Sequence, residues 1–216
     1  MTDSQYTHIA VVADRSGSMA SIVKDMNGGL KSFLDEQAKF PGTLTVDITT
    51  FDTVVEKPNS FAAVSDVKFP VIVPRGGTAL YDALGSTVVS LGESLAKLPE
   101  ERRPAKVIVL VITDGQENSS QEYRGKEGAD RVKALVETQR NDFQWEFIFL
   151  GANIDSFDVA GGLGFAKGAT INYGANAGDV SNVLRSTSSY VNATRSGLAA
   201  NFTEEDREES VANLTK

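Results

Sequence analysis

The chain has 216 residues, of which 41% are hydrophobic and 23% charged, as expected for one globular domain with a sizeable core. Its 29 acidic residues outnumber 21 basic ones, and the formal charge of -8 argues against a dominant role in nucleic-acid binding, because Lys and Arg hold phosphates. The lack of cysteine and the single histidine exclude disulfides, thiolate zinc sites, cysteine nucleophiles and histidine-rich metal sites.

The first predicted strand covers residues 8–13, an apolar run that indicates burial on both faces. It opens with His8, which we interpret as a structural residue. From Ile22 the apolar residues recur at helical spacing, so residues 14–19 are predicted to form a strand-to-helix turn. Alternate positions of this turn carry a carboxylate and two hydroxyls, Asp14, Ser16 and Ser18. These residue types are also common helix caps. Taken alone, they favour neither a cation site nor a simple capping role.

The next elements predict an edge to the sheet. An amphipathic helix over residues 22–34 is followed by a strand at residues 44–49, in which apolar and polar residues alternate as in a strand with one face open to water. Residues 54–56 are predicted to pair with this strand as an antiparallel hairpin. Residues 61–73 have no clear pattern and are expected to form a loop with one short extended piece.

A second predicted helix begins at Thr78, directly after Gly76-Gly77. The most apolar run of the chain, residues 106–113, then predicts a central buried strand that ends at Asp114. A helix at residues 129–136 follows.

The last part of the chain continues the alternation of strands and helices. Residues 145–150 predict a strand that ends on the same sheet edge as Asp114 if the crossovers are right-handed. Asn153 or Asp155 could approach that edge, although a turn-forming role is favoured. The glycine-rich residues 161–168 lack the spacing of a phosphate-binding loop. We expect a final strand, a long helix and an acidic helix start, at residues 169–173, 180–191 and 203–209.

Three loops therefore offer oxygen donors at one edge of the predicted sheet. In open parallel sheets, ligands bind outside the carboxyl ends of the strands, where these loops lie. The donors are one carboxylate and two hydroxyls in the first loop, the Thr78 hydroxyl in the second and the Asp114 carboxylate in the third. Hard oxygen donors of low total charge suit Mg2+, with Mn2+ and Ca2+ as competitors.

This ordered set resembles the metal-ion-dependent adhesion site (MIDAS) of the von Willebrand factor A (vWA) family. The family pattern Asp-x-Ser-x-Ser, then Thr, then Asp is met in full by Asp14, Ser16, Ser18, Thr78 and Asp114. The resemblance covers roughly residues 6–200. It implies an α/β fold of the Rossmann-like, doubly wound kind, with a mostly parallel central sheet, one antiparallel edge strand and helices on both faces.

The resemblance also implies how the site works. Ser16, Ser18 and Thr78 would bind the cation directly, while Asp14 and Asp114 would act largely through bridging waters. A cation neutralised so little remains electrophilic, so an Asp or Glu carboxylate of a partner protein can complete its shell. We expect a metal-dependent protein-interaction module, in which a change of coordination linked to movement of the C-terminal helix switches affinity.

Two other functions stay open. Small standalone vWA domains resemble proteins of bacteria and their viruses. The first alternative is therefore a structural component, of a phage particle or a stress system, whose metal stabilises an assembly. A metal-dependent phosphohydrolase would need a second acid two residues after Asp14, where Ser16 stands, and a cation for phosphate, for which Arg15 and Arg75 are nearby. The chain has no Gly-x-Ser-x-Gly elbow either, and we expect no enzyme activity.

The expected domain order is an N-terminal tail at residues 1–5, a vWA domain at 6–200 and an acidic, helical C-terminal tail at 201–216. The N-terminus lacks the basic and apolar segments of a signal peptide, and no apolar run approaches the ~18 residues of a membrane span. We therefore expect a cytoplasmic protein, or one associated with a virion, with no membrane contact. Its oligomeric state is left open.

Overall fold

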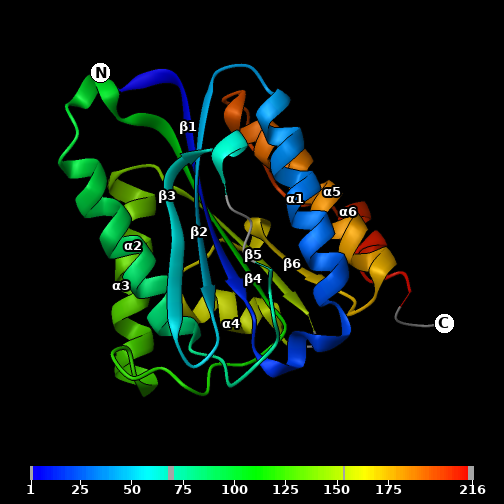
Figure 1. The fold of residues 1–216 in the computed structure, drawn as a ribbon. Helices are drawn as coiled ribbons and strands as arrows, with labels where there is room; N and C mark the ends of the chain where they lie inside the picture. Colours follow the sequence, from blue (N-terminus) through cyan, green and yellow to red (C-terminus); the bar gives the residue numbers. More distant parts are fainter. Residues whose placement is uncertain (1, 68–70, 153, 214–216) are drawn as a thin grey trace.

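The computed structural model describes residues 2–67, 71–152 and 154–213. In these ranges six strands form one sheet in the order β3-β2-β1-β4-β5-β6 (Figure 1). Every neighbouring pair is parallel except β2 and β3, which are antiparallel. The strands are β1 (Asp3–Asp14), β2 (Thr43–Phe51), β3 (Val55–Ala63), β4 (Pro104–Thr113), β5 (Glu146–Ala152) and β6 (Thr170–Tyr173). The expected Rossmann-like arrangement with one antiparallel edge strand is thus confirmed.

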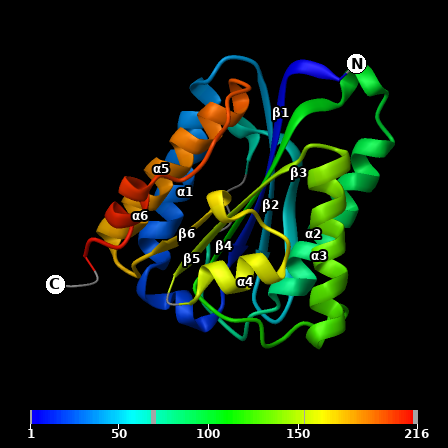
Figure 2. The same cartoon turned by 180° about the vertical axis from the view of Figure 1, so that it is seen from behind.

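Helices cover both faces of the sheet, α1 and α5 on one and α2 and α3 on the other (Figures 1 and 2). The α-helices are α1 (Val23–Lys39), α2 (Leu80–Ala96), α3 (Gly125–Asp142), α4 (Ser156–Gly162), α5 (Ala177–Arg195) and α6 (Glu204–Glu209). Short 3-10 turns are η1 (Gly17–Ser21), η2 (Val64–Asp66), η3 (Glu100–Arg102) and η4 (Lys167–Ala169). No helix of the described ranges is long and apolar enough to cross a membrane.

The central strands are apolar on both sides because each side meets a helix layer. In β1, Ile9 and Val11 pack into the core beneath α1 and α5, whereas Ala10 and Val12 pack into the core beneath α2 and α3. Residues of β4 alternate in the same way. Full burial of such side chains stabilises a fold by roughly 1.5–3 kcal/mol each, so the two layers hold the central strands, and the loops after them, firmly in place.

Two strands extend into segments that the sequence pattern predicts to be a tail or a loop. The strand β1 begins at Asp3, within the expected tail, since the Asp3 N–H donates to the Arg103 carbonyl at 2.9 Å. The edge strand β3 continues to Ala63, into the segment expected as a loop, with register shifts along its pairing with β2. Both extensions rest on backbone hydrogen bonds, which residues other than proline make whatever their side chain, so these extensions leave no side-chain pattern.

The C-terminal segment packs against the domain. Thr203 caps α6 in a capping box with Asp206, the helix start expected from the acidic residues. Beyond the helix, the Ser210 hydroxyl donates to the Asn172 carbonyl at 2.6 Å, and the Gly174 N–H donates to the Ser210 carbonyl at 2.9 Å. These bonds fasten α6 to the end of β6, beside α5 (Figure 2).

Candidate metal centre

The five expected donors lie in loops at the carboxyl ends of β1 and β4 and just before α2, at the lower end of the sheet in Figure 1. Asp14 is the last residue of β1, Ser16 directly precedes η1, and Ser18 is the second residue of η1. Thr78 stands two residues before α2, and Asp114 directly follows β4. The topology brings the two strands side by side, since β1 pairs directly with β4.

A continuous row of hydrogen bonds joins the first loop to the third. The hydroxyls of Ser16 and Ser18 are 3.0 Å apart, and the Ser18 hydroxyl donates to Asp114 Oδ1 at 2.6 Å. On the inner side, Asp14 accepts from the Ser16 N–H and from the Thr113 hydroxyl, each at 2.6 Å. Both Asp14 oxygens thus have protein partners, whereas Asp114 Oδ2 has none in the described part of the chain.

The Thr78 hydroxyl lies near the Ser18 hydroxyl because the residue after Asp114 is a glycine. A methyl group at Gly115 would lie 2.9 Å from the Thr78 hydroxyl and 3.5 Å from the Ser18 hydroxyl. Both hydroxyls therefore converge on the backbone next to Asp114, in space that any larger residue at position 115 would fill. The structure thus brings the three loops together at one point.

The carboxylates of this centre are buried without a compensating cation. Burial raises the pKa of Asp14 to about 6, an effect to which the negative charge of Asp114 adds and which the hydrogen bonds from Thr113 and Ser16 oppose. Burial likewise raises the pKa of Asp114, against the hydrogen bond from Ser18. No Lys or Arg within the described ranges forms an ion pair with either carboxylate. A divalent cation would supply the missing positive charge.

The donor set fits a hard cation that is only partly enclosed. All its atoms are oxygens, and the described residues contain no group of three or more His, Cys, Asp or Glu side chains placed for a metal. Hydroxyls would have to provide the remaining ligands. Ser18 is exposed while Asp14, Ser16, Thr78 and Asp114 are buried, so the centre opens to solvent on the Ser18 side.

Two arginines that the sequence places near the site are already engaged. Arg15 lies 2.8 Å from Asp52 and 2.8 Å from Glu56, and Arg75 lies 2.7 Å from Asp52 and 2.9 Å from Glu56. The backbone adds a bond from the Arg75 N–H to the Arg15 carbonyl at 2.9 Å. These contacts tie the first loop, the β2–β3 turn and the Thr78 loop together.

The loop after Asp114 holds residues that sequence reasoning missed. The Glu117 carboxylate accepts from the N–H groups of Tyr81, Ser119 and Ser120, at 2.7 to 2.9 Å. Asn118 accepts from the Thr78 N–H at 2.8 Å. Both residues brace the start of α2, and only their position just after Asp-Gly could have drawn attention to them.

Other candidates lie elsewhere. Asn153 is outside the described residues, and Asp155 caps α4 by accepting from the Asp158 N–H at 3.2 Å.

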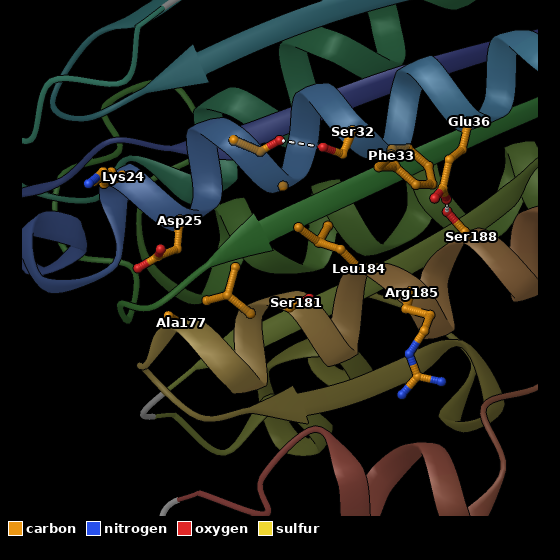
Figure 3. A pocket seen from close by; sticks show the side chains of 13 residues that line it. Lys24, Asp25, Ser32, Phe33, Glu36, Ala177, Ser181, Leu184, Arg185 and Ser188 are labelled. Atoms are coloured by element: carbon orange, nitrogen blue, oxygen red, sulfur yellow. Dashed lines mark hydrogen bonds between the residues drawn. The ribbon is translucent and has the colours of Figure 1, made fainter.

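A surface pocket of about 470 Å3 lies between α1 and α5 (Figure 3), where Glu36 accepts a 2.9 Å hydrogen bond from Ser188. The pocket is lined by residues of those two helices and includes none of the five donors.

Comparison with known proteins places the fold. Proximal thread matrix protein 1 from the mussel byssus matches with a TM-score of 0.61 and 15% identity, over 88% of this chain and 47% of that one. Another structure of the mussel protein has a zinc-occupied MIDAS motif. A von Willebrand factor type A structure from Catenulispora acidiphila matches with a TM-score of 0.59 and 13% identity, over 86% and 42% of the chains.

A third match is the vWF domain of the type V pili tip protein Mfa5 from Porphyromonas gingivalis, with a TM-score of 0.61 and 8% identity, over 92% of this chain and 98% of that one. The chain spans less than half the length of the mussel and Catenulispora structures. A comparison with protein-family models found no match, and neither did one with curated proteins. At these identities the similarity shows the fold, which is that of a vWA domain.

Proposed function

We propose that the chain is a vWA-family domain that binds a partner protein through a divalent cation. The observation that carries this proposal is the row Ser16, Ser18 and Asp114, joined by hydrogen bonds across 96 residues of sequence and open to solvent at Ser18. Hydroxyls held in line at the edge of a sheet, next to two uncompensated carboxylates, have the chemistry of a MIDAS.

We propose Mg2+ as the cation, with Mn2+ and Ca2+ as alternatives. Ser16, Ser18 and Thr78 would hold it through their hydroxyls, and Asp14 and Asp114 would balance its charge. When bound, the cation supplies an electrophilic position for an Asp or Glu carboxylate of the partner. The zinc-occupied MIDAS of the mussel protein supports a divalent ion at a site of this type.

The geometry favours binding over hydrolysis. A phosphohydrolase needs a free cation to hold phosphate, but Arg15 and Arg75 are each paired with both Asp52 and Glu56. Position 16, where a second acid would stand, is a serine whose hydroxyl contacts Ser18. The hydroxyls and carboxylates of this centre can hold a metal ion and leave a position for a partner's carboxylate, which supports a binding role.

Affinity capture from the source cell tests the proposal. Wild type, Thr78→Ala and the surface control Thr138→Ala on α3 are compared in Mg2+ and in EDTA. We expect specific partners with wild type and with the control in Mg2+ only, and their loss with Thr78→Ala. Partners that persist in EDTA and with Thr78→Ala would place the interface away from the metal centre.

A further inference from the structure

One residue beside the metal centre, Tyr173, is absent from the expected donor set. It is the last residue of β6, and its backbone is in register with Ala152 of β5. Thr113 of β4 is in register with Gly151, so the next residue, Asp114, is in line with Ala152. Tyr173 and Ala152 thus occupy one row across β6 and β5, and Asp114, directly after the end of β4, extends this row.

Ala152 and Tyr173 also belong to one face of the sheet, and the alternation along β4 points Asp114 to the same face. Ile112, Ala152 and Tyr173 all pack into the core beneath α1 and α5, and Asp114 follows Ile112 by two residues, the period at which a strand returns to the same face. The residue in the middle of the row is an alanine. Its small side chain takes up little of the space over β5 between Tyr173 and Asp114.

Two polar atoms at this place lack partners. The Tyr173 hydroxyl is buried, with 1% of the residue exposed, and has no hydrogen bond within residues 2–67, 71–152 and 154–213. Asp114 Oδ2 is buried and unpartnered in the same ranges. Burial raises the pKa of Tyr173, and the negative charges of Asp114 and Asp14 add to this effect, so the hydroxyl is in the electrostatic field of both carboxylates. Buried polar groups are almost always hydrogen-bonded, commonly through an ordered water.

We propose that Tyr173 is a positioning residue of the metal centre, whose hydroxyl donates to a water shared with Asp114 Oδ2. The proposal rests on the proposed function, because it assigns the second oxygen of Asp114 to the water shell of the cation. Ser18 fixes Oδ1 and Tyr173 fixes the water at Oδ2, so the carboxylate has one orientation. Groups that orient metal ligands in this way typically change metal affinity by about 10- to 100-fold when removed.

The test is Tyr173→Phe, which removes only the hydroxyl. We expect the Mg2+ dissociation constant, measured by titration calorimetry, to rise on the order of tenfold. The melting temperature in EDTA should stay the same or rise, since an unpartnered buried hydroxyl is lost. A crystal structure of wild type with Mg2+ should contain a water within hydrogen-bond distance of the Tyr173 hydroxyl and Asp114 Oδ2.

Tyr190→Phe is the matched control. The Tyr190 hydroxyl is also in the core but donates to Glu146 at 2.7 Å, away from the metal centre, so this variant should melt lower in EDTA and bind Mg2+ like wild type. Equal Mg2+ affinity for wild type and Tyr173→Phe would overturn the role of Tyr173 while the metal centre stands. If wild type and Thr78→Ala both fail to bind Mg2+, the proposed function itself fails, and the role of Tyr173 fails with it.

Discussion

Thr78 and Asn118 hold each other through two reciprocal hydrogen bonds. The Thr78 N–H donates to Asn118 Oδ1 at 2.8 Å, and the Asn118 N–H donates to the Thr78 carbonyl at 2.9 Å. Asn118 lies four residues after Asp114, so the pair fastens the Thr78 loop to the Asp114 loop. Gly77 permits the contact, because a methyl group there would collide with the Asn118 and Ser119 side chains. The loops that carry Thr78 and Asp114 come from distant parts of the chain and are thereby held together. We call this pair of hydrogen bonds the Asn118 clamp.

Removing this clamp should weaken metal binding. In Asn118→Ala the Thr78 N–H loses its acceptor, which should destabilise the protein by about 1–3 kcal/mol and free the Thr78 loop. We expect the Mg2+ dissociation constant to rise on the order of tenfold. Calorimetric titration and urea unfolding measure the two effects. Asn118→Asp keeps an oxygen acceptor and should retain most of the affinity; an Ala variant that binds Mg2+ as wild type does would exclude a role for the clamp.

Gly115 should not tolerate a side chain. In Gly115→Ala the new methyl group would lie 2.9 Å from the Thr78 hydroxyl, so the hydroxyl must shift from its position. We expect the rise in melting temperature on adding Mg2+ to be largely lost. Gly161→Ala on α4 is the control, since nothing lies within 4 Å of its methyl group, and it should leave the Mg2+ response unchanged. Full Mg2+ stabilisation of Gly115→Ala would show that the Thr78 hydroxyl is not a ligand.

Asp14→Asn should raise the free energy of unfolding in EDTA, because it removes a buried negative charge. The pKa of Asp14 is about 6 in the folded protein and about 3.8 in the unfolded chain, so folding disfavours the charged form. This loss of stability in EDTA is absent below pH 3.8, grows as pH rises to 6 and is complete above that. At pH 7.5 in EDTA the variant should therefore be more stable than wild type by roughly 1–3 kcal/mol.

In Mg2+ the order should reverse, because wild type gains the binding energy of the cation and Asp14→Asn does not. Thermal unfolding of both proteins in each buffer measures this crossing. If Asp14→Asn is the less stable protein in EDTA and responds to Mg2+ as wild type does, then Asp14 is a structural acid and no part of the metal centre.

His8 should make the protein sensitive to acid. The residue is fully buried, contacts the Thr45 hydroxyl at 2.9 Å, and its ring centroid lies 4.5 Å from that of Phe61. Burial lowers its pKa to about 4; nearby Asp47 opposes this shift and Lys57 adds to it. The unfolded chain takes up a proton at about pH 6.5, and the folded protein does so only near pH 4. Stability is therefore lost as pH falls from 6.5 to 4, by about 3 kcal/mol at most.

His8→Gln removes the titrating group from both states. We expect the free energy of unfolding to be lower and to change less with pH across this window. Urea unfolding at a series of pH values measures both effects. An unchanged slope between pH 6.5 and 4 would mean that His8 is protonated in the folded protein.

The local pattern of the sequence predicted most of the elements. Apolar runs at residues 8–13 and 106–113 marked the two central strands, because burial on both faces demands apolar residues at every position. The oxygen donors could be found for a related reason. Asp14 and Asp114 follow these runs directly, Ser16 and Ser18 follow within a few residues, and Thr78 stands at the start of a predicted helix. The carboxyl ends of neighbouring parallel strands meet at one edge.

Contacts between distant segments could not be predicted. The docking of α6 through Ser210, the pairing of Arg15 and Arg75 with Glu56 and the clamp at Asn118 each depend on chain segments that only the complete fold brings together. None of these residues differs in type from ordinary surface or turn residues. Their roles come from register and topology rather than from local sequence.

The sequence by itself determined which atoms are available, namely two carboxylates and three hydroxyls in loops after buried strands or before a helix. Tertiary structure alone decided that Ser18 reaches Asp114, that Gly115 leaves room for Thr78, and that one Asp114 oxygen has no partner among the described residues. The physical reason is the separation along the sequence over which each kind of interaction acts. Hydrophobic periodicity acts over a few residues and is written in the chain, whereas hydrogen bonds between loops depend on distances that exist only after the sheet has assembled.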